Sequence, residues 1–143
     1  PFAETIESQY EKRKKLFKDQ TVLPQFDLKT IKAYNVLGGV NPYPNISNWF
    51  DALEDMKRQI DETDFDIALI GCGAYAFNLA AHVKRKGKKG ITLFGGLQTL
   101  FGIYGARHEE DFKKFGILNE YWVRPRSNER PSGFQNVENG AYW

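Results

Sequence analysis

The chain has 143 residues, 41% of them hydrophobic and 15% aromatic, which is enough to bury one domain core and excludes a wholly disordered chain. Its 20 Lys and Arg residues against 18 Asp and Glu give a net charge of +2, too balanced for the basic face of a nucleic-acid-binding protein. The lone Cys72 excludes an internal disulfide and suits a reducing compartment, and with only two histidines beside it we expect no structural metal. No apolar run reaches the length of a membrane span and no signal-peptide pattern opens the chain, so we expect a cytoplasmic protein.

The first third of the chain predicts a helix and then a strand. Apolar residues recur at helical spacing from Phe2 to about Lys18, and the run from Leu28 to Leu37 alternates like a strand that ends at Gly38-Gly39. Because Pro1 stands where a helix begins and no initiator Met precedes it, we expect a piece of a longer protein whose preceding strand is missing.

The middle of the chain alternates helices and short apolar strands. Ser47 or Asn48 is expected to cap a helix that runs to about Ile60, and the apolar run Phe65 to Ile70 is typical of a strand buried on both faces. A helix over 74–86, a strand over 91–94 and a further helix from about Leu97 follow.

This order predicts the fold class. Strands that alternate with helices favour a parallel sheet, so we expect one α/β domain over 1–143, with a three-layer Rossmann-like open sheet and helices on both faces. We expect that domain to be part of a larger one and residues 124–143 to form an extended tail.

The segment Gly71-Cys72-Gly73-Ala74-Tyr75-Ala76 carries the main functional signal. It follows a buried strand and opens a helix, which is the context of the phosphate-binding fingerprint G-x-G-x-x-G/A. Glycines allow the tight turn and bring backbone amides of the helix N-terminus close to a phosphate. The alternative is a tight turn that serves only the packing of the helix on the sheet.

A second pair of glycines, Gly95-Gly96, is predicted at the carboxyl end of the next strand. A ribose-binding acid belongs there in a dinucleotide site, and its absence argues against NAD and for another phosphate-bearing ligand, such as a nucleotide sugar. Further contacts are then expected from a small set of side chains: Tyr75, Asn78 and Gln98, with Arg107 or His108 as the counter-charge.

Three other features have less specific interpretations. Cys72 lies near a helix N-terminus, which lowers a thiol pKa, but the sequence places no base beside it, so we expect a small buried residue. Asp64-Phe65-Asp66 matches a D-x-D metal motif yet precedes the strand, opposite the expected ligand end. Arg124, Arg126 and Arg130 suit a diphosphate clamp, a solvated tail or a contact with another subunit of a homo-oligomer.

Several blocks resemble one family of bacterial proteins associated with surface-polysaccharide gene clusters, whose fold is similar to GT-D type glycosyltransferases. The similar blocks are Pro1-Phe2-Ala3-Glu4, Phe65 to Ala81, Gly87-Lys88-Lys89, Gln98, Leu100 to Ile103 with Gly105 and Arg107, and Tyr142-Trp143. The chain departs from the family pattern at Ala76, Asn78, Thr92 and Phe94, where Gly, Pro, His and Gly are expected.

The resemblance implies the carboxyl-terminal, sugar-nucleotide-binding part of a glycosyltransferase in polysaccharide biosynthesis. The glycine turns and their neighbours then predict a ligand site of Gly71 to Tyr75, Gly95, Gly96, Gln98 and Arg107. It places the D-x-E motif for a divalent metal upstream of this sequence, so no cofactor is expected within the chain and the catalytic residues stay unassigned. A non-catalytic Rossmann-like scaffold or interaction domain is the main alternative, and a dinucleotide-dependent oxidoreductase is a weaker one.

Overall fold

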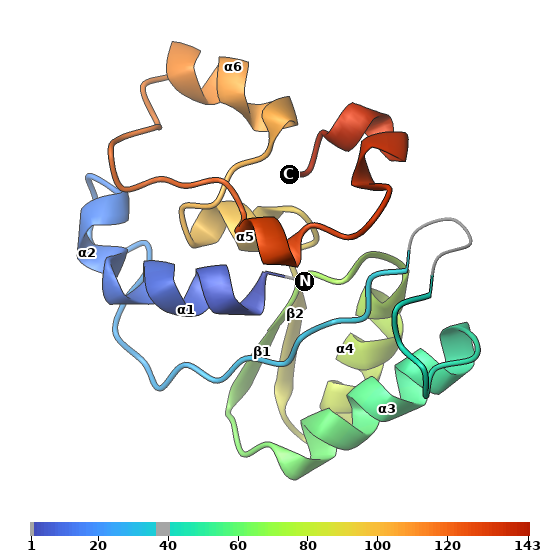
Figure 1. Ribbon diagram of the computed structural model, residues 1–143. Coiled ribbons are helices and arrows are strands. Elements are labelled where there is room, and N and C mark those ends of the chain that lie inside the picture. The colour runs from blue at the N-terminus through green and yellow to red at the C-terminus, as the bar shows by residue number, and fades with distance from the viewer. Residues whose placement is uncertain (1, 37–40) are drawn as a thin grey trace. The chain divides into compact units, whose positions relative to one another are not determined.

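A computed structural model describes residues 2–36 and 41–143 as a mixed α/β protein, mostly helical, with a two-stranded parallel sheet packed against helices (Figure 1). Its residues fall into two compact units. Unit 1 runs from Ile31 to Leu97, and unit 2 combines Phe2–Thr30 with Gln98–Trp143. None of the described helices combines the length and the apolar character needed to cross a bilayer.

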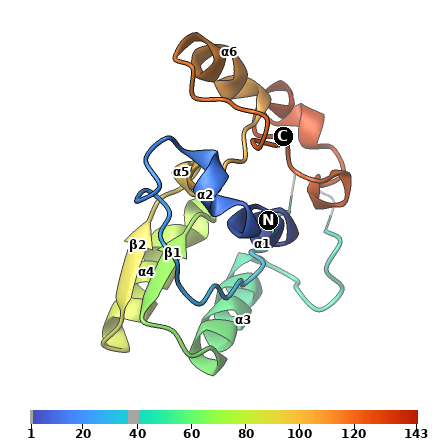
Figure 2. The same cartoon turned by 90° about the vertical axis from the view of Figure 1, so that its left-hand side faces the viewer.

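The centre of unit 1 is a strand–helix–strand element. Strand β1 (Ile67–Ile70) leads through a single 3-10 turn into helix α4 (Ala76–Arg85), and the chain returns as strand β2 (Lys89–Thr92). The strands are parallel, as Figure 2 shows, and in their register Ile67 is opposite Lys89 and Ile70 is opposite Thr92. This part of the predicted parallel arrangement is confirmed.

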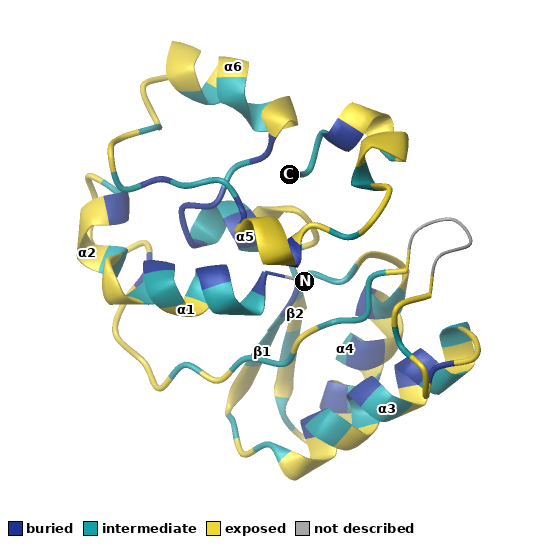
Figure 3. Cartoon of the chain, viewed as in Figure 1, coloured by how far each residue is buried: buried dark blue, intermediate teal, exposed yellow. Residues whose placement is uncertain are grey.

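Helix α3 (Trp49–Glu62) completes the core of unit 1. It begins as expected, because the Asn48 side chain accepts hydrogen bonds from the amides of Phe50 and Asp51 at 2.8 and 3.1 Å. One stripe of α3 and the inner face of α4 are buried together with the end of β1 (Figure 3). The side chains in this core are Leu53, Met56, Ile60, Ile70, Ala76, Leu79 and Val83. Each large aliphatic chain buried there contributes about 1.5–3 kcal/mol.

The expected strand over 28–37 is wrong for residues 28–36, which have no regular secondary structure, and residues 37–40, including Gly38-Gly39, lie outside the described chain. Alternate residues of the segment do face the core, since Ile31 and Ala33 are partly buried against it. Tyr34 also fixes the segment, because its hydroxyl donates to Asp55 of α3 at 2.7 Å. The alternation thus reflects a segment that packs on helices rather than a paired strand.

Unit 2 contains α1 (Ala3–Glu11), α2 (Arg13–Leu16) and α6 (Ala106–Lys114), and α5 (Gly96–Leu100) begins in unit 1 and ends in unit 2. The single helix expected over 2–18 is interrupted at Lys12. The buried residues of α1 are the polar Thr5 and Gln9, which form hydrogen bonds with Glu129 and with backbone carbonyls of distant segments. Residues 124–143, expected as an extended tail, contain three short 3-10 turns and end at the buried Trp143.

Candidate functional site

The first glycine turn lies where the sequence predicts it, between the end of β1 and the start of α4. Gly73 adopts a φ of +54°, a conformation that L side chains rarely take, and nothing would touch a Cβ placed on it. Gly73 and Ala74 are exposed, and they begin the 3-10 turn that continues into α4. The first amides of such a helical run have no partner within it, so they can bind an anion.

The second glycine turn abuts the first. Gly71 lies so close to the turn after β2 that a Cβ at position 71 would stand 2.7 Å from the Phe94 carbonyl oxygen and 2.8 Å from Leu97 Cβ. Gly95 and Gly96, in contrast, have open space around the Cβ position and are exposed. The loops that follow the two parallel strands thus meet at Gly71, and the glycines beside this point carry no side chains. Open α/β sheets bind ligands at this place, the carboxyl ends of their strands.

Tyr75 is held beside this turn by a stacking contact. Its ring lies 5.1 Å from the Trp49 ring, with the two planes inclined by 7°. Burial raises the pKa of its hydroxyl, so the phenol stays protonated near pH 7. Asn78 is exposed in the first half of α4.

Cys72 is a free thiol in a half-buried position. Burial raises its pKa to about 11, so the thiol is protonated at neutral pH and is a poor nucleophile. A reactive thiolate at the start of a helix would have a lowered pKa. The interpretation of Cys72 as a small packing residue therefore has the support of its environment.

Gln98 and Arg107 belong to unit 2, so unit 1 brings together only the glycine turns and Tyr75. Gln98 is buried, and its Nε2 finds no hydrogen-bond partner among the described residues. Arg107 pairs with Glu138 at 3.8 Å and lies over the Tyr142 ring at 4.7 Å. Burial, and then the charge of Arg107, lower the pKa of His108, so His108 is neutral at pH 7 and cannot serve as a counter-charge there.

Charged residues of the other candidate sites, Asp64, Arg124 and Arg126, form ion pairs within their own units. Asp64 stands before β1, at its amino end as expected, and lies 3.2 Å from the Lys88 amino group. Arg124 pairs with Glu109 and Arg126 with Glu4. Across residues 2–36 and 41–143, no three acidic, histidine or cysteine side chains gather as a metal site requires.

An aromatic pair, Phe77 and Phe94, lies beside the glycine turns, and Phe77 was not among the residues predicted there. The rings of Phe77 and Phe94 lie 5.4 Å apart, and the two residues are 69% and 43% exposed. Phe94 adopts a φ of +48°. The helical period could have identified Phe77 as an exposed aromatic residue, because it lies off the stripe of Ala76, Leu79 and Val83 that faces the core.

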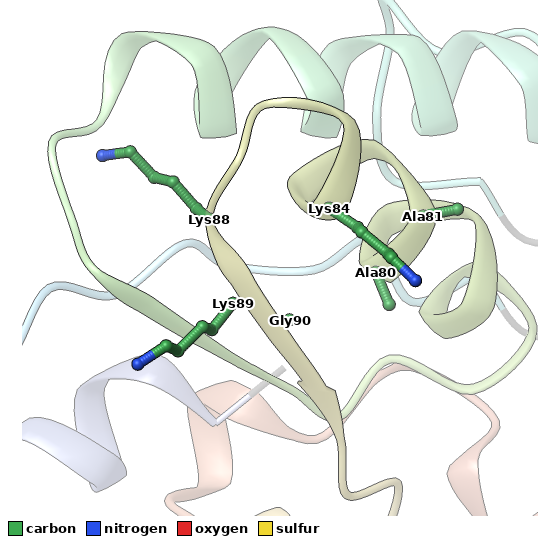
Figure 4. Close-up of a pocket in the computed structure, with 6 residues that line it drawn as sticks. All are labelled: Ala80, Ala81, Lys84, Lys88, Lys89 and Gly90. Atoms are coloured by element: carbon green, nitrogen blue, oxygen red, sulfur yellow. The ribbon is translucent and has the colours of Figure 1, made fainter.

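A pocket of about 430 Å³ lies elsewhere on unit 1, between the second half of α4 and the amino end of β2 (Figure 4). It contains none of the predicted site residues. Comparison with protein-family models, with curated proteins and with solved structures finds no match for this chain.

Proposed function

We propose that the two glycine turns of unit 1 bind the diphosphate of a nucleotide sugar, and that the chain is the donor-binding part of a cytoplasmic glycosyltransferase in bacterial surface-polysaccharide biosynthesis. One observation carries the proposal. Gly71 lets the turns after β1 and β2 meet, while Gly73 and Gly95 have open space around their Cβ positions beside the meeting point.

The chemistry follows from the start of α4. Amides in the turn before a helix carry partial positive charge and can donate hydrogen bonds to phosphate oxygens, and glycines let those oxygens approach the backbone. Neither turn carries a carboxylate that would repel a diphosphate. In this proposal β1 and β2 belong to a larger three-layer Rossmann-like sheet that continues beyond β1, and a divalent metal is held by residues outside the printed sequence.

The direct test is an NMR titration with uridine diphosphate or guanosine diphosphate. The amide signals of Gly71, Gly73 and Gly96 are expected to shift in the low-millimolar range or below. Signals that stay in place at several millimolar of either nucleotide would contradict the proposal.

A matched pair of variants at Gly95 separates charge from shape. Both Gly95→Asp and Gly95→Asn fit, because nothing lies within 4 Å of the Cβ position. The carboxylate of Gly95→Asp should weaken nucleotide binding by about tenfold or more through repulsion of the diphosphate, whereas Gly95→Asn should bind much as the natural chain does. Equal weakening in both variants would mean that the loop, and not a nearby phosphate, responds.

A non-catalytic scaffold or interaction domain remains the second candidate. The close packing of Gly71 on Phe94 and Leu97 favours it, since that packing explains the first glycine without any ligand. A scaffold domain would be folded, and its amide signals would not shift with either nucleotide. The weaker oxidoreductase hypothesis is tested by titration with reduced nicotinamide cofactor, whose fluorescence should then change.

A further inference from the structure

Among the residues that the structure describes, strand β2 pairs along one edge only, and we call the other its free edge. Its neighbour β1 pairs with it on one side, where the amide of Lys89 donates to Asp66 and that of Leu93 to Ile70, at 3.3 and 2.8 Å. In a parallel ladder alternate residues direct their backbone N–H and C=O groups to opposite edges. Gly90 and Thr92 therefore direct theirs away from β1, to an edge along which no described strand pairs.

Helix α4 overhangs the amino-terminal half of this edge with small side chains. Gly90 approaches the helix so closely that a Cβ on it would lie 3.2 Å from the Cα and the carbonyl oxygen of Ala80. Beside this contact lies the pocket of about 430 Å³, whose lining is Ala80, Ala81, Lys84, Lys88, Lys89 and Gly90 (Figure 4). The small side chains leave room for those of an incoming segment.

The other half of the edge is bordered by the exposed aromatic pair. Phe77 lies one helical turn before Ala80 and Ala81 on the same side of α4, and it contacts Phe94 just beyond the end of β2. Parallel sheets are normally covered on both faces, so an exposed strip of this kind next to a free edge is unusual.

Lysines flank the hollow, and in Figure 4 the side chains of Lys88 and Lys89 point away from it. Lys84 and Lys89 make no ion pair within the described chain, and their amino groups lie on either side of Gly90 in Figure 4. The third lysine, Lys88, is held by Asp64 and by a contact with the Phe65 ring at 4.6 Å. Lysines on an edge strand oppose pairing with a like-charged copy of the chain, but they attract an acidic strand.

We propose that the free edge of β2 binds an extended acidic segment of a partner protein as a third strand. Backbone hydrogen bonds to Gly90 and Thr92 supply affinity, as in other cases of strand addition. Acidic side chains lie at the end with Lys84 and Lys89, and apolar side chains cover Phe77 and Phe94 at the other end.

The probes are two eight-residue peptides, one with four Glu followed by four Val and one in the reverse order, since the pairing direction is left to the experiment. One of them is expected to shift the amide signals of Gly90 and Thr92 and to slow their hydrogen exchange at least tenfold. The charge reversal Lys84→Glu with Lys89→Glu should weaken that binding at least tenfold. Lys14→Glu with Lys18→Glu, at exposed positions in unit 2, is the matched control and should leave it unchanged.

Three results would overturn the proposal. The first is unchanged Gly90 and Thr92 signals at several millimolar of both peptides. The second is peptide binding that resists the Lys84 and Lys89 reversal while far-UV circular dichroism shows an intact fold. The third is protection of the two amides without peptide, with a doubled mass in sedimentation, which assigns the edge to a second copy of this chain.

Discussion

The backbone of Gly71 packs directly against the carbonyl group of Phe94, at a distance that no side chain at position 71 could share. A Cβ there would stand 2.7 Å from the Phe94 oxygen and 2.8 Å from Leu97 Cβ. The relationship joins the turn after β1 to the turn after β2, and so it sets the spacing of the two glycine loops. It also separates the role of Gly71, which is packing, from that of Gly95, which lies in open space.

The substitution Gly71→Ala should therefore destabilise unit 1. Backbone and a Cβ carbon must move to admit the new methyl group, which costs about 1–3 kcal/mol of unfolding free energy. The measurement is urea denaturation followed by circular dichroism. Gly95→Ala is the matched control and should stay within about 0.5 kcal/mol of the natural chain, because its methyl group meets nothing. Equal stability of both variants would show that the turns do not meet at Gly71.

Because the backbone of Phe94 is left-handed, a Gly variant at this position should be more stable than an Ala variant, the reverse of the usual order. At a φ of +48° an L residue is strained, and glycine is not, so Phe94→Gly is expected to be more stable than Phe94→Ala by about 1 kcal/mol. Both variants lose the ring contact with Phe77 equally, so the difference isolates the strain. At the exposed Phe115, where φ is −88°, the Gly variant should be no more stable than the Ala variant. Urea denaturation of all four variants provides the test, and an Ala-over-Gly preference at position 94 would contradict it.

The parts that sequence reasoning identified correctly rest on local signals. The apolar run before Gly71 and the helical period after it suffice to predict the turn between β1 and α4. The contact of Gly71 with Phe94 could not be read in the same way, because it joins residues from different turns. The burial of Gln9 is a similar case, since the side chain donates to the carbonyl of Tyr121, 112 residues away, at 2.8 Å. An alternating segment such as residues 28–36 also gives no sign of whether a strand partner exists.

The half-buried Cys72 thiol should resist alkylation. A pKa of about 11, raised by burial from 9.0, leaves roughly 100-fold less thiolate at neutral pH than an ordinary cysteine has. The folded chain is expected to react with iodoacetamide at pH 7.5 roughly 100-fold more slowly than the urea-unfolded chain, and its rate should climb until about pH 11. Because the folded pKa lies above the unfolded one, the associated stabilisation is complete below about pH 9 and is lost as pH rises through about 11. Equal rates in the folded and unfolded chains would show that the thiol is accessible and ionised.

Asp55 should give unit 1 an acid-sensitive contribution to stability. Hydrogen bonds from Tyr34, then Arg58 and Gln59, lower its pKa from 3.8 to about 2. A lowered folded pKa means that the stabilisation is present above about pH 4 and is lost as pH falls through about 2. Since the side chain is 22% exposed and solvent screens the Arg58 pair, we expect Asp55→Asn to cost on the order of 1 kcal/mol at pH 7.

The pH dependence and a double-mutant cycle test this contribution together. The stability gap between the natural chain and Asp55→Asn, measured by urea denaturation, should narrow steadily between pH 4 and pH 2. Tyr34→Phe should lose part of the same free energy, and the double variant should cost less than the sum, because the Tyr34 hydroxyl donates directly to the Asp55 carboxylate at 2.7 Å. Glu54→Gln is the control, since Glu54 is 70% exposed and its ion pair is with Lys57. A gap that stays constant down to pH 2, or strictly additive losses, would mean that residues 31–36 are not held on α3 through this carboxylate.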